Sequence, residues 1–334
     1  MSEPALVFGL PLYGRGEHLE ESVESLLAQT RRDVAIVASD DAPELGARAV
    51  LERFKDPRIT YHANERRLGL VGNWRRAFEL ARREHPAAPY FAWASDHDAW
   101  HPLWAERLIE LLDGDPRAVV AYPRTYRMNR DGHTLTTKPW SFDTAGLDRR
   151  TARLGRTVRG MSAGNMVYGA YRVEALERAG VFRYALLPDR LLLTELSLQG
   201  HLRQAPELLF YRRATEPPSI ERQRAAFWPD GAPSWASLPW AWQHVGLLAG
   251  ALARDGGALG IPPGERARLV VTHAYASLME NLRSAAGRCY YVRIMRRRSV
   301  KQLAARELNR GVAWAQGKPY GPELLAAGRR LLGG

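Results

Sequence analysis

The sequence predicts an α/β protein with a doubly wound, mainly parallel sheet and a C-terminal helical region. Through residues 5–122, short apolar runs typical of buried strands alternate with amphipathic stretches typical of helices. Two of the apolar runs end directly in aspartates, at Asp40 and Asp96. Near Pro217 the alternation stops, and the chain becomes rich in tryptophan and then helical in pattern.

The first β-α-β unit opens the chain. Residues 5–10 are apolar and predict a buried strand that turn residues then end. Residues 18–29 place apolar side chains on one helical face and glutamates on the other. Residues 34–39 form a second apolar run, closed by Asp40 and Asp41. We expect two parallel strands joined by a right-handed crossover.

The later elements are less regular. Residues 123–160 are basic and polar without a clear period, so we expect a functional loop or lid there rather than a plain connection. The other expected elements are helices over 44–54, about 73–83, 103–112, 172–179 and 190–199, and a helical region over about 247–309. Strands are expected over 58–61, 90–95, 118–122 and 206–211, and a strand and turn over 161–172.

Composition narrows the function classes. The single cysteine, Cys289, excludes internal disulfides and cysteine-built zinc sites. The chain has no apolar run long enough to span a bilayer, and its first residues lack a signal-peptide pattern, so we expect a cytoplasmic protein. The formal net charge is +12, yet no helix-turn-helix, RNA-recognition or zinc pattern is present. We therefore expect no nucleic acid among its partners.

The excess positive charge lies near the C-terminus. Nine basic residues stand between Arg283 and Arg310, against the single acid Glu307. Such a stretch suits peripheral contact with the anionic inner face of a cell membrane. It equally suits packing on the first domain or on a second subunit of a homo-oligomer.

Two carboxylates flank an imidazole where the run at 90–95 ends, in Asp96-His97-Asp98. In open α/β sheets, ligands bind in the crevice beyond the carboxyl ends of the strands. Closely spaced carboxylates there suit a hard divalent cation that also holds phosphate oxygens. The alternative is a helix cap with no ligand, because Asp is favoured before helices.

Five ordered motifs carry a resemblance. They are Leu10-Pro-Leu-Tyr13-Gly-Arg15, Ser25-Leu-Leu-Ala-Gln-Thr30, Val37-Ala-Ser-Asp40-Asp41, Arg67-x-Gly69-x-x-x-Asn73 and Asp96-His97-Asp98. Together they resemble the P-x-Y-N-R, S-L-L-x-Q-T, V-V-D-D-G-S, R-x-G-x-x-x-N and D-x-D elements of family 2 glycosyltransferases, over about residues 5–213. The sequence departs from that pattern at Gly14, at His97 and in lacking the Gly-Ser after Asp41.

The resemblance implies a GT-A fold and a metal-dependent, inverting transfer of a sugar from a nucleotide-diphospho-sugar. The change in pattern near residue 216 predicts a domain boundary there, with a helical region over 217–334 that has no assigned counterpart in the family. The resemblance implies that residues 1–216 are the catalytic domain, with a nucleotide-sugar-binding half at 1–122 and an acceptor half at 123–216. It implies a UDP-, GDP- or dTDP-type donor, with Mn²⁺ or Mg²⁺ as cofactor. The implied donor-binding residues are Pro11, Tyr13, Arg15, Asp40, Asp41, Arg67 and Asp96, and the implied metal ligands are Asp96, His97 and Asp98.

The proton acceptor implied by the resemblance is Asp189, at the start of the helix expected over 190–199. An inverting transfer needs a base that takes the acceptor hydroxyl's proton. Glu195 is a weaker candidate, and Asp189 also suits a helix cap. Trp140, Tyr168 and Tyr171 suit either stacking on a sugar or core packing.

The acceptor stays open among a glycan, a lipid-linked molecule and a small molecule. The Q-x-x-R-W signature of processive synthases is absent from the sequence, which favours addition of one sugar. The implied pathway is bacterial surface polysaccharide or glycoconjugate synthesis. The alternative function is a nucleotide-sugar-binding protein without catalysis, which the departures at Gly14 and His97 favour.

Overall fold

The computed structural model describes residues 3–14, 16–129, 132, 134–135, 140–214 and 220–280. Residues 1–278 form one compact unit, and residues 279–334 form a second. Arg15, Cys289 and the basic stretch from Arg283 to Arg310 lie outside the described residues.

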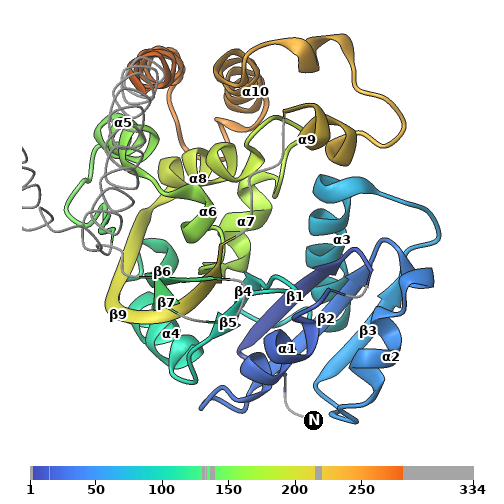
Figure 1. The fold of residues 1–334 in the computed structure, drawn as a ribbon. Coiled ribbons are helices and arrows are strands. Elements are labelled where there is room, and N and C mark those ends of the chain that lie inside the picture. Colours follow the sequence, from blue (N-terminus) through green and yellow to red (C-terminus); the bar gives the residue numbers. More distant parts are fainter. Residues whose placement is uncertain are drawn as a thin grey trace, which may run out of the picture. The chain divides into compact units, whose positions relative to one another are not determined.

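Within the described residues, one nine-stranded sheet runs through the first unit (Figure 1). Its strand order is β3-β2-β1-β4-β8-β6-β9-β5, and β7 pairs with β6. The strands are β1 (Leu6–Leu12), β2 (Val34–Asp40), β3 (Ile59–Ala63), β4 (Tyr90–Trp93), β5 (Ala99–Trp100), β6 (Ala118–Met128), β7 (Thr134–Leu135), β8 (Ala170–Arg172) and β9 (His201–Arg213).

The first half of the sheet is parallel. The β1–β2 register runs from Leu6 opposite Val34 to Leu12 opposite Asp40. On its other side β1 pairs with β4, and β2 pairs with β3. The register therefore brings the end of β1 beside the end of β2, with β4 as the next strand along. β2 and β4 are buried throughout, as strands covered on both faces should be.

The second half of the sheet is mixed. β8 is antiparallel to both β4 and β6, so β6 runs in the same direction as β4. β9 lies parallel to β6, from His201 opposite Ala118 to Arg213 opposite Met128. The short β5 pairs antiparallel with β9 at the edge.

Helices cover both faces of the sheet. One core holds apolar residues of α1, α2 and α4, and the other holds residues of α3, α5, α7, α8 and α10. The predicted doubly wound α/β fold and its C-terminal helices are confirmed. The helices are α1 (Leu19–Leu27), η1 (Pro43–Leu45), α2 (Ala47–Glu52), α3 (Gly69–Glu84), α4 (Trp104–Gly114), α5 (Arg150–Gly160), α6 (Ala163–Met166), α7 (Val173–Ala179), α8 (Pro188–Gln199), α9 (Ile220–Phe227), η2 (Ser234–Ser237) and α10 (Trp240–Asp255), and residues 263–278 are also helical.

Several elements differ from their predicted form. The stretch expected as an irregular loop from 123 to 160 contains the second half of β6 and all of α5. The strand expected over 206–211 is the longer β9, and residues 163–166 form the short helix α6. In the part of the chain that the structure describes, no helix is both long and apolar enough to cross a membrane.

Candidate functional site

A cavity of about 330 Å³ is lined by residues at the carboxyl ends of β1 and β4. Six of the residues named from the sequence as donor-binding residues or metal ligands line it, namely Pro11, Tyr13, Asp41, Arg67, Asp96 and His97. These residues come from four separate segments of the chain, and the parallel register of β1, β2 and β4 brings three of those segments to one edge of the sheet. The structure thus gathers most of the predicted donor site in one place.

The two aspartates at the end of β2 have different roles. Asp40 is fully buried, and its carboxylate accepts hydrogen bonds from the Ala42 nitrogen at 3.0 Å and the Tyr61 hydroxyl at 2.8 Å. Asp41 lines the cavity and accepts from the backbone nitrogens of Leu68 at 2.7 Å and Gly69 at 2.8 Å. Asp41 therefore satisfies amide donors at the start of α3 that have no partner within the helix.

Tyr13 and Arg67 lie at the open side of this cavity. The Arg67 guanidinium carbon lies 4.8 Å from the centre of the Tyr13 ring, a cation–π contact. The Tyr13 residue is 57% exposed, so its ring is available to another flat group. Gly14, which follows, has a φ of +79°, and a Cβ there would lie 2.6 Å from Leu45 Cδ1. Glycine therefore fits this turn, because a side chain there would meet both the left-handed backbone and Leu45.

Asn73, another residue of the cavity lining, holds the neighbouring elements together through its side-chain amide. Its side-chain amide donates to the Leu12 carbonyl at 2.8 Å, and its oxygen accepts from the Ser39 hydroxyl at 2.7 Å and from Asn64 at 3.0 Å. Asn73 is buried in α3. The polar network therefore ties β1, β2 and α3 together directly behind the cavity.

The three residues Asp96, His97 and Asp98 do not all face the cavity. Asp98 is buried, and its carboxylate accepts from the Ser95 hydroxyl at 2.6 Å and from the Arg213 backbone nitrogen at 2.8 Å. Asp96 and His97 line the cavity and contact each other, with His97 Nδ1 2.7 Å from Asp96 Oδ1. Burial lowers the pKa of His97, but the hydrogen bond to Asp96 and the charges of Asp98 and Asp96 outweigh it, and the net pKa is raised.

The donor set fits a divalent cation that is held jointly with a substrate. Among the described residues, no group of three or more His, Cys, Asp or Glu side chains is arranged to hold a metal. Mg²⁺ is commonly bound by one or two carboxylates together with substrate phosphates and water. At the cavity wall Asp96 supplies one carboxylate and His97 an imidazole, and an imidazole ligand suits Mn²⁺ better than Mg²⁺.

Asp189 lies in the first turn of α8 and is partly buried. Its Oδ1 accepts from the Arg190 backbone nitrogen at 2.9 Å, which satisfies one amide at the helix start. Burial raises the pKa of Asp189, and this outweighs the lowering by that hydrogen bond and by the charges of Arg190 and Arg212.

Tyr168 is a cavity residue whose pKa is affected by the charge of Asp189. Tyr168 lines the cavity, and its pKa is raised by burial and then by the charges of Asp98, Asp96 and Asp189. The carboxylates at the end of β4 and at the start of α8 therefore act on the same side chain. Asp189 is not itself part of the cavity lining.

Glu195 faces a different part of the molecule. It is buried, and Arg183 Nε donates to its carboxylate at 2.6 Å. Burial raises the pKa of Glu195 to about 7, against the lowering effect of Arg183. It lines a small hollow beside α10 together with Leu248 and Asp255. We therefore place Glu195 in the support of α8 rather than at the cavity.

The sequence interpretation missed three contributors. Trp74 of α3 and Ala226 of α9 also line the cavity, so the region after residue 216 forms part of its wall. Arg212 donates to the Asn165 side chain at 2.7 Å, and its charge lowers the pKa of both Asp189 and His97. No hydrophobic periodicity in the sequence identifies Trp74, Arg212 or Ala226 as site residues. Of the aromatic residues singled out, Tyr171 is fully buried and Trp140 stacks on Phe142 at 5.5 Å.

A model of glycosyl transferase family 2 matches residues 8–178 of the sequence. The chain belongs to glycosyl transferase family 2. It is therefore a glycosyltransferase, an enzyme that transfers a sugar from a nucleotide sugar. The segments 11–13, 41, 67 and 96–97 that line the cavity all lie within the matched residues.

Solved structures resemble this glycosyltransferase in fold. The crystal structure of S. aureus TarS 1-349 in complex with UDP-GlcNAc is 12% identical, covers 84% of this chain and 92% of that chain, and has a TM-score of 0.52. The mannosyltransferase PcManGT from Pyrobaculum calidifontis, in complex with GDP-Man and Mn²⁺, is 16% identical over 84% of this chain and 88% of that chain, with a TM-score of 0.46. No curated protein sequence matches the chain. The likeness to TarS supports the GT-A-like fold.

Proposed function

We propose that this glycosyltransferase binds a nucleotide-diphospho-sugar in the cavity at the ends of β1 and β4 and transfers one sugar, with inversion, to an acceptor hydroxyl. One observation carries the proposal. Residues from four segments that are distant in sequence, including Tyr13, Arg67 and Asp96, line a single cavity that also contacts Tyr168. We call it the donor cavity.

The nucleotide fits the Tyr13 side of the donor cavity. The exposed Tyr13 ring offers a flat face, and the Arg67 guanidinium beside it matches phosphate geometry. Asp41 already accepts three hydrogen bonds, from Leu68, Gly69 and Asn64. A carboxylate has about four acceptor positions, so one remains for a base N–H or a ribose hydroxyl. Asp40 is fully buried, and its carboxylate is bonded to Ala42 and Tyr61.

The diphosphate fits the Asp96 side. Asp96 and His97 would hold Mn²⁺ or Mg²⁺ there, and the cation when bound neutralises negative charge that develops on the departing diphosphate. Asp98 keeps the loop in place, because both of its oxygens are bonded within the protein. Arg213 adds to this support by donating to the His97 carbonyl at 2.9 Å.

Asp189 fits the role of general base. The acceptor hydroxyl would lose its proton to the Asp189 carboxylate while its oxygen bonds to the sugar carbon and the bond from that carbon to the diphosphate breaks. A raised pKa makes a carboxylate a stronger base, provided that it remains ionised at the working pH. Tyr168, which lines the donor cavity, suits stacking on the transferred sugar.

The acceptor is proposed to be a glycan, a lipid-linked molecule or a small molecule, in bacterial surface polysaccharide or glycoconjugate synthesis. We also propose that the protein is cytoplasmic, with peripheral contact to the inner face of the membrane. The boundary at residue 216 stays a prediction, although Ala226 beyond it lines the donor cavity.

A thermal-shift panel tests the donor proposal. Nucleotides and UDP-, GDP- and dTDP-sugars are added with and without Mn²⁺ or Mg²⁺, since a ligand of the native state raises its apparent stability. We expect one nucleotide class to raise the midpoint, more strongly with metal. Tyr13→Ala should reduce that shift, and Tyr275→Ala should not, because Tyr275 is similarly exposed at 59% but lies on the helix over 263–278. No shift with any nucleotide would refute the proposal.

A further inference from the structure

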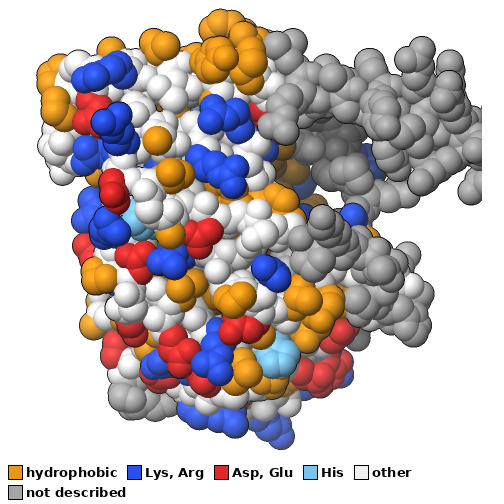
Figure 2. All heavy atoms as spheres, turned by 90° about the vertical axis from the view of Figure 1, so that its left-hand side faces the viewer, with side chains coloured by type: hydrophobic (Ala, Val, Ile, Leu, Met, Phe, Trp, Pro, Cys, Tyr) orange, Lys and Arg blue, Asp and Glu red, His pale blue; other side chains and the backbone are white. Residues whose placement is uncertain are grey.

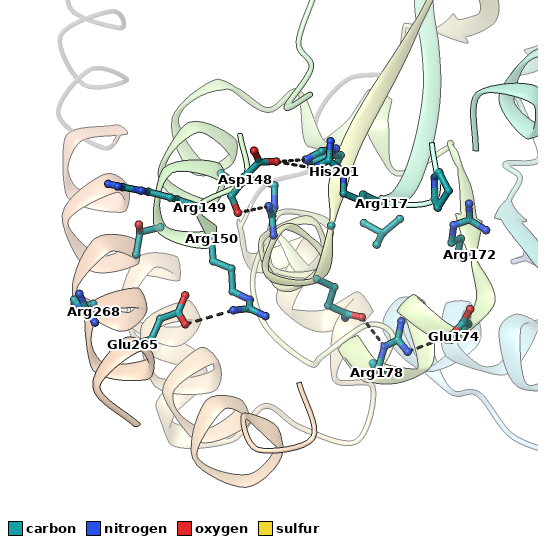
Figure 3. Close-up of a pocket in the computed structure, with 16 residues that line it drawn as sticks. Arg117, Asp148, Arg149, Arg150, Arg172, Glu174, Arg178, His201, Glu265 and Arg268 are labelled. Carbon is teal, nitrogen blue, oxygen red and sulfur yellow. Dashed lines mark hydrogen bonds and ion pairs between the residues drawn. The ribbon is translucent and has the colours of Figure 1, made fainter. Parts of the chain in front are cut away.

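A larger hollow, of about 970 Å³, lies apart from the donor cavity. Figure 3 shows its side chains, which come from α5 and the residues just before it, from α7, from the helix over 263–278, from the ends of β8 and α8, and from the starts of β6 and β9. Its lining contains seven arginines and three carboxylates. We call this hollow the arginine pocket.

The arginine pocket is at the opposite edge of the sheet from the donor cavity. Arg117 immediately precedes β6, and His201 begins β9. Both strands run in the same direction as β4. Their starts therefore lie at the edge where β4 begins, whereas the donor cavity lies where β4 ends. The mechanism proposed above uses none of the side chains of the arginine pocket.

The three carboxylates neutralise only part of the positive charge. Each pairs with one arginine, at 2.7 Å for Arg117–Asp148, 3.4 Å for Arg150–Glu265 and 3.2 Å for Arg178–Glu174. The Arg150–Glu265 and Arg178–Glu174 contacts appear as dashed lines in Figure 3.

The other four arginines of the lining have no carboxylate partner in the described part of the chain. Arg153 and Arg172 donate to backbone carbonyls, at distances that include 2.5 Å from Arg153 to Ser197 and 2.6 Å from Arg172 to Leu112. Arg268 donates to the Gly264 carbonyl at 3.3 Å, and Arg149 is exposed without a partner among the described residues. The pocket therefore keeps a surplus of four positive charges.

The charges around the pocket act on the buried Arg153. Burial lowers the pKa of Arg153, and the neighbouring charges of Arg150 and Arg117 lower it further, against the raising effect of Asp148. A bound anion would relieve this repulsion. Figure 2 shows that Lys and Arg side chains are spread over the face on the left of Figure 1, among Asp and Glu. Basic surface alone therefore marks no site in this protein, whereas the arginine pocket is both hollow and uncompensated.

We propose that the arginine pocket binds a ligand that carries at least two phosphate groups. A guanidinium fork matches the oxygens of a phosphate, and several such forks from separate elements need more than one anionic group to satisfy them. The volume suits a ligand larger than a single phosphate ion. The phosphates would belong either to a soluble polyphosphorylated molecule or to neighbouring lipid headgroups. The arginines of the pocket would bind the phosphate oxygens of either one in the same way.

Calorimetric titration with inorganic tripolyphosphate, in EDTA, tests the proposal on the full chain. We expect the double variant Arg117→Gln with Arg178→Gln to weaken binding by about tenfold or more, through loss of charged hydrogen bonds. The matched control is Arg53→Gln with Arg107→Gln, since these exposed arginines pair with Glu20 and Glu110 at 2.8 Å on other elements. The control should bind as the wild type does.

A variant that binds tripolyphosphate more tightly would show that the changes in affinity do not come from misfolding. Glu174 is exposed and competes for Arg178, so Glu174→Gln should tighten tripolyphosphate binding by about two- to fivefold. Glu110→Gln, the equivalent change beside Arg107, should leave it unchanged.

Sedimentation with lipid vesicles distinguishes a soluble polyphosphorylated ligand from lipid headgroups. An equal mixture of phosphatidylcholine and phosphatidylglycerol is compared with phosphatidylcholine alone. If Arg117→Gln with Arg178→Gln weakens sedimentation with the anionic vesicles, the phosphates are those of lipid headgroups. If that variant weakens tripolyphosphate binding only, the ligand is soluble. The proposal fails if the wild type binds neither probe, or if the two double variants bind both probes equally well.

Discussion

The Asp41 carboxylate, at the end of β2, accepts a 2.8 Å hydrogen bond from the backbone nitrogen of Gly69, at the start of α3. The same carboxylate holds the Leu68 nitrogen at 2.7 Å. One side chain therefore fixes the helix start, while it also lines the donor cavity. The geometry is compatible with both a helix-capping and a donor-binding role for Asp41.

Asp41→Ala is expected to lower the free energy of unfolding by about 1–3 kcal/mol, because two backbone donors near the cavity floor lose their acceptor. Urea denaturation of the variant measures this. Asp230→Ala serves as the control, since Asp230 is 83% exposed and pairs with Arg66 only at 3.4 Å. An unchanged urea midpoint for Asp41→Ala would show that the cap contributes nothing.

Gly69→Ala is expected to destabilise the protein and to loosen the packing of α9 against α3. Gly69 has a φ of +73°, and a Cβ there would lie 2.6 Å from the carbonyl oxygen of Ala226. The left-handed conformation alone costs an L-residue about 1–2 kcal/mol. The matched control is Gly246→Ala in α10, where no atom lies within 4 Å of the added Cβ.

Gly246→Ala should instead stabilise by about 0.5–1 kcal/mol, because alanine loses less conformational freedom than glycine in a helix. Thermal denaturation measures the melting temperatures of both variants and of the wild type. Equal melting temperatures for Gly69→Ala and Gly246→Ala would contradict the close approach of α9.

Acid should destabilise the protein through two buried histidines. Burial lowers the pKa of His244 to about 3 and that of His273 to about 4, and neither ring nitrogen of His273 has a hydrogen-bond partner among the described residues. In the unfolded chain both titrate near an ordinary value of about 6.5. Between that value and 4 the unfolded state binds more protons, so stability falls as pH falls.

His273→Phe removes one of the two groups that take up protons on unfolding. The loss of stability below pH about 6.5 should then be less steep by up to about 1.4 kcal/mol per pH unit. Glu195, with a pKa of about 7, shifts stability in the opposite direction over part of this range, so the comparison is between variant and wild type at each pH. Parallel pH profiles for the two proteins would show that His273 is not titrated on unfolding.

Much of the first half of the fold follows from local patterns. The strands β1, β2 and β4 are continuous apolar runs, and parallel pairing places their ends at one edge, so the grouping of Pro11, Asp41 and Asp96 was predictable. The second half was harder to predict. β6 is only partly buried from Arg124 to Tyr126, and β9 is exposed in its middle at Pro206 and Glu207, so neither is a continuous apolar run. Their pairing is also non-local.

Local sequence patterns were also insufficient to predict parts of the candidate site. Sequence spacing treats Asp96 and Asp98 alike, but the hydrogen bond from Arg213 turns Asp98 into a buried support. That contact joins residues 115 positions apart, so no local pattern announces it. The contribution of Ala226 to the donor cavity depends in the same way on long-range packing, against Gly69.

The rate of sugar transfer by Asp189→Asn, compared with its donor affinity, tests the central claim most directly. With the donor identified by thermal shift, we expect the turnover rate of Asp189→Asn to fall by roughly 10²–10⁴-fold. Its dissociation constant for the donor should equal that of the wild type. Asp255→Asn, an exposed change at the end of α10, should turn over as the wild type does. Full turnover by Asp189→Asn would contradict the account.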